Sequence, residues 1–164
     1  FLHKMRKLAG CGTMIRDSSK GSVEPNGWKA NITYFLNNED AAKLRKGMLL
    51  IVDMLFAAGA KRVKPLMNGS RFWASRHRAR SAVMSSSATG DHTLYASHPL
   101  GSCRMSADAR RGVVRPSDGQ THDIENLHVT DGSVMPSAPG VNPQVTIMAT
   151  ALQLARGIVS NVNT

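Results

Sequence analysis

The segment PGVNPQVTIMATALQLARGIV, residues 139–159, constrains the fold of this chain more than any other. Asn142 predicts a helix N-cap, and Pro143 suits a first helical turn, where no backbone N–H is required. The residues that follow are apolar on nearly every side of the predicted helix, which indicates a buried helix rather than a surface one. Its apolar face comprises Met148, Ala151, Leu152, Ala155, Ile158 and Val159, widened by Ile147 and Leu154.

The start of this helix raises a functional question. A buried helix N-terminus directs unpaired N–H groups and a partial positive charge at whatever lies before it, and an anion or an electron-rich ring is the natural recipient. An ordinary capped core helix is the alternative interpretation. No apolar run reaches the roughly 18 to 20 residues that span a bilayer, so we expect a soluble protein.

The first part of the chain predicts antiparallel strands followed by a helix. Residues 12–36 indicate short extended segments, with a turn at the SSKG sequence of residues 18–21 and a strand at NITYFL, residues 31–36. Asn38 predicts the N-cap of a helix that ends at Gly59, and we expect this helix to pack under the sheet. Its periodic apolar residues are Leu44, Met48, Ile51, Val52 and Leu55.

Residues 66–90 contain turn signals, a possible short helix and a serine-rich patch, and we interpret them as a loop region or the junction between two lobes. We therefore expect one lobe over residues 1–90 and a second over 91–164. The fold class predicted is α+β.

The net charge of +10 is concentrated in the first predicted lobe. Residues 1–90 hold 16 Lys or Arg against 5 Asp or Glu, whereas residues 91–164 hold 5 against 6. The basic residues show little aromatic interleaving and no zinc-finger or recognition-helix pattern, so we do not expect specific nucleic-acid binding. A solvated basic face, or a surface that docks an acidic partner, explains the charge better.

Cysteine and histidine spacing predicts neither a disulfide framework nor a metal site. Cys11 and Cys103 are the only cysteines and lie far apart in the sequence. Two pairs of histidines are each separated by six residues, which fits neither one helical face nor the usual close ligand pairs.

Two further segments of the last third carry chemistry. In SHPLGSCRM, His98 precedes a proline that holds it in an extended or turn conformation, and Gly101 allows a close backbone approach to a ligand. In VTDGSVMPSAPG, a predicted short strand ends at Asp131 and Gly132, where a carboxylate and an unobstructed N–H would suit the hydroxyls and pyrophosphate of a nucleotide cofactor. Each segment alone is a weak signal, and their order and close spacing strengthen it.

The ordered pair HPLGSCRM and LHVTDGSVMPSAPGVNPQVTIMATALQLA resembles the C-terminal signature of the glucose–methanol–choline (GMC) family of FAD-dependent oxidoreductases. The resemblance covers residues 92–160 and extends to 12–66, which look like the family's substrate domain. The residues of these motifs are closest to those of the long-chain alcohol oxidase and cholesterol oxidase-like branch. It implies that residues 1–90 are a substrate-domain portion and that residues 91–164 are the C-terminal part of the FAD-binding domain, with its strand and buried helix.

The resemblance also implies an active site. The family's active-site histidine falls on His98 and its partner on Asn142, while the flavin-contacting residues fall on Asp131 and Gly132, with Pro143 and Gln144 facing the flavin's pyrimidine edge. The implied reaction is oxidation of an alcohol by hydride transfer to flavin N5, with His98 accepting the hydroxyl proton and Asn142 hydrogen-bonding the same oxygen. A long-chain alcohol or a sterol is the implied substrate.

One departure from the family pattern limits this reading. The family's ADP-binding unit, a strand followed by a G-x-G-x-x-G loop and a helix, has no counterpart in this sequence. The resemblance therefore implies a C-terminal part that needs an N-terminal FAD-binding portion as partner. Alone, the chain is expected to bind flavin weakly or not at all. A non-catalytic basic module that docks nucleic acid or an acidic partner is the alternative, and a fragment unable to fold alone is a third.

Overall fold

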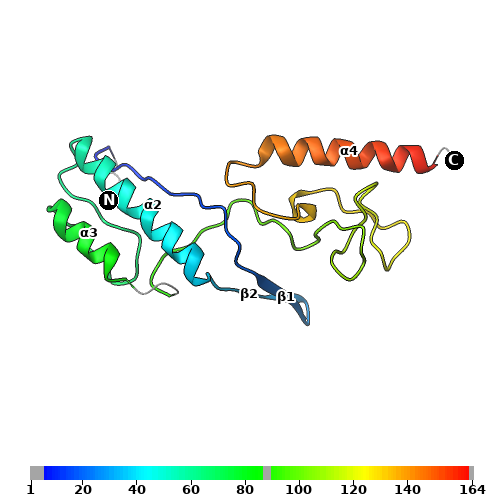
Figure 1. The fold of residues 1–164 in the computed structure, drawn as a ribbon, viewed down its shortest axis with the longest axis horizontal. Helices are drawn as coiled ribbons and strands as arrows, with labels where there is room; N and C mark the ends of the chain where they lie inside the picture. The colour runs from blue at the N-terminus through cyan, green and yellow to red at the C-terminus, as the bar shows by residue number, and fades with distance from the viewer. Residues whose placement is uncertain (1–5, 87–89, 163–164) are drawn as a thin grey trace. The chain divides into compact units, whose positions relative to one another are not determined.

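The computed structural model describes residues 6–86 and 90–162, which form a small sheet and several helices (Figure 1). The elements in chain order are strands β1 (Gly21–Asn26) and β2 (Lys29–Tyr34), helices α2 (Asn38–Ala57) and α3 (Arg76–Met84), the short 3-10 helix η1 (Gly132–Val134) and helix α4 (Gln144–Val162). This content agrees in outline with a partial α+β fold.

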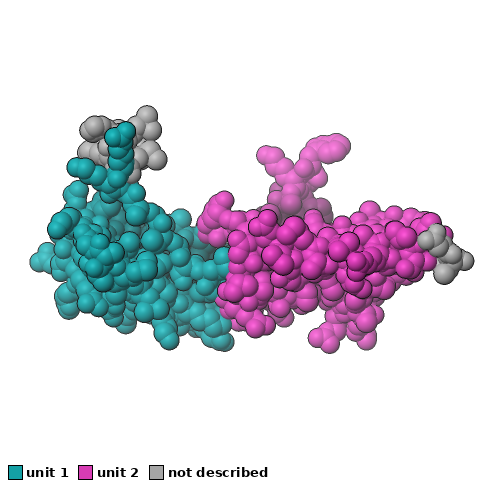
Figure 2. Space-filling model, turned by 90° about the horizontal axis from the view of Figure 1, so that it is seen from above, with its two compact units in different colours: residues 1–15, 34–94 teal, residues 16–33, 95–164 magenta. Residues whose placement is uncertain are grey.

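The chain divides into two compact units (Figure 2). Unit 1 comprises residues 1–15 and 34–94, and unit 2 comprises residues 16–33 and 95–164. The assignment of residues 1–90 and 91–164 to a substrate domain and an FAD-binding domain stays a prediction.

Helix α2 has an asparagine N-cap and a glycine at its C-terminal end, as predicted, but it begins one residue earlier than predicted. The N-cap is Asn37, not Asn38, and its side-chain oxygen accepts a hydrogen bond from the Asp40 N–H at 2.8 Å. At the other end Gly59 adopts a φ of 89°, and the Ala60 N–H bonds the Leu55 carbonyl at 2.9 Å. A left-handed glycine with this bond is the usual way to satisfy the last carbonyl groups of a helix.

The core of unit 1 lies between α2 and α3, which run side by side (Figure 1). Val52 of α2 packs with Ala79 and Val83 of α3, and Val63 from the connecting segment completes the buried cluster. The predicted packing of α2 under a sheet is therefore wrong. Every residue of β1 and β2 is exposed, so this sheet has no buried face on which a helix could pack.

The hairpin that joins β1 to β2 lies at a different place from the predicted turn. Residues 18–21 do not connect two strands, and the chain instead turns at Gly27, whose φ is 60°. Gly27 supplies the left-handed conformation at the first position of the two-residue turn Gly27-Trp28, where a hairpin commonly has glycine. The predicted extended segments at residues 12–17 have no regular structure.

The core of unit 2 is built from loops and one face of α4. Val114, Val134 and Leu154 form its buried cluster, against which Met105 and Val129 pack. The short strand predicted to end at Asp131 and Gly132 does not form, because His128 takes part only in an isolated bridge and residues 132–134 form η1. The Asp131 side chain accepts the Ser133 N–H and so turns the chain at this point.

Helix α4 forms where it was predicted, but the prediction that it is buried is wrong. Leu154 is its single buried residue among those described. Large apolar side chains on its other faces are exposed, because no described element of the chain covers them; they are Val145, Met148, Leu152, Val159 and Val162. The expectation that no apolar run reaches membrane-spanning length is also corrected, since α4 is long and apolar enough to cross a membrane by length and composition alone.

The C-terminal half of α4 is fixed to the loop at residues 115–120 by the buried carboxylate of Asp118. Arg115 donates to this carboxylate at 2.6 Å and the Asn161 amide at 2.8 Å. Burial acts to raise the pKa of Asp118, but hydrogen bonds from the Gln120 N–H and from Arg115 outweigh it and lower the pKa. The carboxylate is therefore ionised and ties the end of α4 to a loop distant in sequence.

Candidate functional site

Gly132 is the point at which the three predicted segments of the site meet, all within unit 2. A Cβ atom built on Gly132 would lie 3.0 Å from Ile147 Cδ1 and 3.1 Å from Leu100 Cδ2. Ile147 belongs to the first turn of α4 and Leu100 lies two residues after His98. The absence of a side chain at Gly132 therefore lets the HPLG segment and the start of α4 approach the Asp-Gly turn together.

Backbone hydrogen bonds fix the HPLGSCRM segment against η1. The Cys103 N–H donates to the Ser133 carbonyl at 3.0 Å, and the Met105 N–H donates to the Val134 carbonyl at 2.8 Å. Gly101 has a φ of 83°, and a Cβ atom there would lie 3.4 Å from the Met135 carbonyl oxygen. A left-handed residue is thus required where this segment turns along η1.

His98 lies at a bend just before this anchored stretch, and its side chain is exposed. No hydrogen bond joins the side chains of His98 and Asn142 in the described part of the chain. Their pairing stays a prediction, while the segments that carry them are brought to the same turn through Leu100 and Ile147.

Asp131 directs its carboxylate at its own turn. One oxygen, Oδ1, accepts the Ser133 N–H at 2.8 Å and also the Ser133 hydroxyl. The hydroxyl and then the N–H of Ser133 lower the pKa of this exposed carboxyl, so that Asp131 is ionised near neutral pH. Its second oxygen remains available to accept a hydrogen bond from a ligand hydroxyl.

The residues at the start of α4 share the capping of the helix. The exposed Asn142 accepts the Gln144 N–H through Oδ1 at 3.2 Å, and the carbonyl of the buried Pro143 accepts the Ile147 N–H at 2.8 Å. The helix thus begins at Gln144, and Pro143 takes the N-cap position predicted for Asn142. Because Oδ1 of Asn142 is engaged, its NH₂ group is the part that remains to donate outward.

These features suit an electron-rich ligand at the start of α4. The first turn contains no acidic residue, so nothing on the helix itself offsets the positive end of its dipole. The N–H groups of Val145 and Thr146 have no acceptor within the helix, as expected for a first turn. No group of three or more His, Cys, Asp and Glu side chains that could hold a metal ion occurs in residues 6–86 and 90–162.

Several residues that build the site were missed from the sequence. Leu100 and Ile147 position the segments through Gly132, and Ser133 holds both Asp131 and Cys103. The Asp-Gly-Ser order was a usable signal for Ser133, since Asp and Ser side chains commonly bond the backbone of a turn. The two apolar contacts had no signal, because they depend on how loops pack.

Comparison with known proteins identifies the family and its extent along the chain. The family pattern described as GMC oxidoreductase matches residues 12–151. A protein named as an uncharacterized GMC-type oxidoreductase, y4nJ of Sinorhizobium fredii, is 35% identical over 92% of this chain and 31% of its own length. The long-chain-alcohol oxidase FAO4A of Arabidopsis thaliana is 31% identical over 95% of this chain and 22% of its own length.

Among solved structures, a formate oxidase from Aspergillus oryzae, in a study of FAD modification, matches 86% of this chain and 25% of its own, with a TM-score of 0.57 and 25% identity. The chain therefore spans between about a fifth and a third of the length of the proteins that it matches. The alternative of a non-catalytic basic module receives no support from these comparisons.

Proposed function

The chain belongs to the GMC oxidoreductase family, and on that premise we propose that it is the C-terminal catalytic segment of an FAD-dependent enzyme that oxidises the CH–OH group of an alcohol. The observation that carries the proposal is the contact of Gly132 with both Leu100 and Ile147. This contact gathers the segments that hold His98, Asp131 and Asn142 within one unit, as a shared active site requires.

The two proposed catalytic side chains have complementary capacities. His98 is exposed and, as a neutral imidazole, can accept the proton of a substrate hydroxyl. Asn142 keeps its NH₂ group free to donate to the same oxygen, because its carbonyl oxygen holds the Gln144 N–H. Together they would remove a proton and orient the carbon that carries the hydride.

The chain's residues fit FAD at the start of α4 and at the Asp-Gly turn. Asp131 offers a free carboxylate oxygen, and the exposed Gln144 begins a helix whose first turn has no acidic residue. We propose that Asp131, Gly132, Asn142, Pro143 and Gln144 form this chain's share of the FAD site. Bound FAD would supply the acceptor of the hydride.

The remaining part of the FAD site would come from an N-terminal portion. The family members y4nJ and FAO4A extend well beyond the region that they share with this chain. We propose that an N-terminal FAD-binding portion completes the enzyme, and that a long-chain alcohol or a sterol is the substrate. The similarity to a long-chain-alcohol oxidase supports the first of these substrates.

The test replaces His98 by alanine in the chain produced together with its N-terminal portion. His77 is the matched control, since it is also exposed but lies on α3 of unit 1. We expect His98→Ala to slow flavin reduction by a long-chain alcohol on the order of 10²-fold or more, because loss of a general base commonly has this effect. Bound FAD, measured by absorbance, should be unchanged, and His77→Ala should behave as the parent. Reduction by the His98→Ala enzyme at the parent rate would contradict the assignment.

A further inference from the structure

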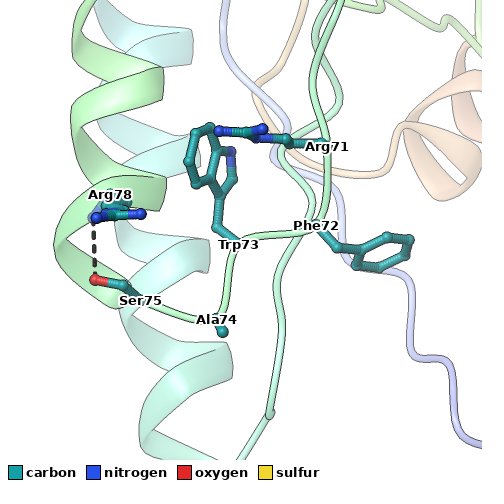
Figure 3. Close-up of a pocket in the computed structure, with 6 residues that line it drawn as sticks. All are labelled: Arg71, Phe72, Trp73, Ala74, Ser75 and Arg78. Atoms are coloured by element: carbon teal, nitrogen blue, oxygen red, sulfur yellow. Dashed lines mark hydrogen bonds between the residues drawn. The ribbon is translucent and has the colours of Figure 1, made fainter.

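A cavity on unit 1, separate from the candidate active-site segments, has the chemistry of an anion site. It has a volume of about 460 Å³ and is lined by Arg71, Phe72, Trp73, Ala74, Ser75 and Arg78 (Figure 3). These residues precede and begin helix α3, and none of them belongs to the candidate active site. Figure 3 shows the Arg71 guanidinium lying against the Trp73 indole, while Phe72 points away from it.

The charges that line this cavity are positive and have no carboxylate partner. The Asp53 carboxylate of α2 is paired with Arg76 at 2.8 Å and with Arg80, both of α3. No ion pair involves Arg71 or Arg78 in the described residues. The neighbouring arginines of α3 thus use the carboxylate, and the two cavity arginines remain uncompensated.

The cavity also holds hydrogen-bond donors without acceptors. Trp73 Nε1 is shielded from solvent and has no hydrogen-bond partner among the residues that the structure describes, and an unsatisfied buried donor of this kind is destabilising. The Ser75 hydroxyl accepts the Arg78 N–H at a long 3.4 Å, and the first turn of α3 contains no acidic residue. The donors of the helix N-terminus therefore add to those of the side chains.

The Arg71 guanidinium stacks on the ring of Trp73. The Arg71 guanidinium carbon lies 4.3 Å from the centre of the Trp73 ring, within the range of a cation–π interaction. The Arg71 side chain is long and its residue is exposed, so it can rotate toward a ligand in the cavity.

We propose that this cavity binds a phosphate group, held by the guanidinium groups of Arg71 and Arg78, the Trp73 N–H and the N-terminus of α3. A doubly charged oxyanion matches a site that offers donors and positive charge alone, and arginine is well suited to phosphate oxygens. The group is either inorganic phosphate or the phosphate of a small ester. This role goes beyond alcohol oxidation and does not depend on it.

Trp73 serves as the reporter for the test. The chain has two tryptophans, and replacing the fully exposed Trp28 by phenylalanine leaves Trp73 as the source of indole fluorescence. The 164-residue Trp28→Phe chain is titrated with inorganic phosphate and, separately, with glycerol 2-phosphate, with sodium chloride at matched ionic strength as the reference. We expect a saturable change in Trp73 emission with both phosphates and none with chloride.

The arginine variants decide whether the response comes from this cavity. Arg71→Gln and Arg78→Gln should each weaken phosphate binding about tenfold or more, because each removes a charge-assisted hydrogen bond. Arg110→Gln, at a strongly exposed arginine of unit 2, should bind as the parent does. Equal binding of the two phosphates assigns the site to the phosphate group alone, and tighter binding of the ester assigns it to an ester. A missing response, an equal response to chloride or full binding by both cavity variants would overturn the proposal.

Discussion

Replacing Gly157 by alanine tests how α4 docks on unit 2. Gly157 lies in the second half of α4, and a Cβ atom there would lie 2.0 Å from the Ser117 carbonyl oxygen. The next nearest atoms are the Ser117 carbonyl carbon at 2.9 Å and Asp118 Cα at 3.2 Å. All three belong to the backbone of the loop that carries Asp118, so no side-chain rotation can relieve the overlap.

The expected magnitude follows from two opposing effects. Alanine favours a helix interior over glycine by about 1 kcal/mol, which alone would stabilise the variant. Overpacking against a backbone typically destabilises by about 1–3 kcal/mol. Moving α4 away also stretches the hydrogen bond from Asn161 to the buried Asp118, and a bond to a charged group contributes about 1.5–3 kcal/mol. We expect a net loss of about 2–4 kcal/mol in the free energy of unfolding.

Urea unfolding of the 164-residue chain, followed by circular dichroism at 222 nm, measures this loss. Gln153→Ala is the matched control, because Gln153 is an exposed residue of the same helix and its replacement should change stability by less than about 0.5 kcal/mol. If Gly157→Ala were as stable as the parent or more stable, helix propensity would have decided the outcome. The close approach of α4 to Ser117 would then be refuted.

Two further perturbations test the C-terminal end of α4 and the N-terminal end of α2. Asp118 has a pKa below its unfolded value, so the stability that it contributes is present above about pH 4 and is lost as pH falls toward its folded pKa. The urea midpoint of the parent should therefore fall between pH 7 and pH 3. The Asp118→Asn variant should have a lower midpoint at pH 7 and a smaller fall over the same range. Parallel curves for the two proteins would refute this role of Asp118. Asn37→Ala removes the bond to the Asp40 N–H at 2.8 Å and should destabilise by about 1 kcal/mol in thermal melts, whereas Asn38→Ala, one residue inside α2, should have a smaller effect. Equal losses in the two variants would contradict the capping role of Asn37.

The sequence predicted those elements whose signals are local. Helix α2 was confirmed with its predicted apolar residues, because periodicity and the Gly59 stop are properties of adjacent residues. The same reasoning chose residues 18–21 for a turn and passed over Asn26-Gly27, although an Asn-Gly pair is the stronger hairpin signal. The error came from choosing between two local signals, not from a long-range effect.

Predictions that depended on neighbours were wrong or incomplete. The apolar residues of α4 indicated burial, but Val145 is 74% exposed and Leu154 is 1% exposed on the same helix. An apolar pattern reports which side chains gain by burial and does not say whether a partner surface is present. For the site, motif order pointed to the segments of His98, Asp131 and Asn142, whereas the contacts at Gly132 that gather them arise from loop packing.

The order of the two units along the chain has a consequence for biosynthesis. Arg16, near the start of unit 2, packs its side chain where a Cβ atom of Gly140 would lie, at 3.0 Å. During translation, residues 16–33 leave the ribosome long before residues 95–164 exist, and residues 34–94 of unit 1 emerge in between. Because nascent domains fold largely as they emerge, unit 1 can complete its helical core first. The hairpin is therefore synthesised before the rest of unit 2, and it can join that unit only after residues 95–164 have been made.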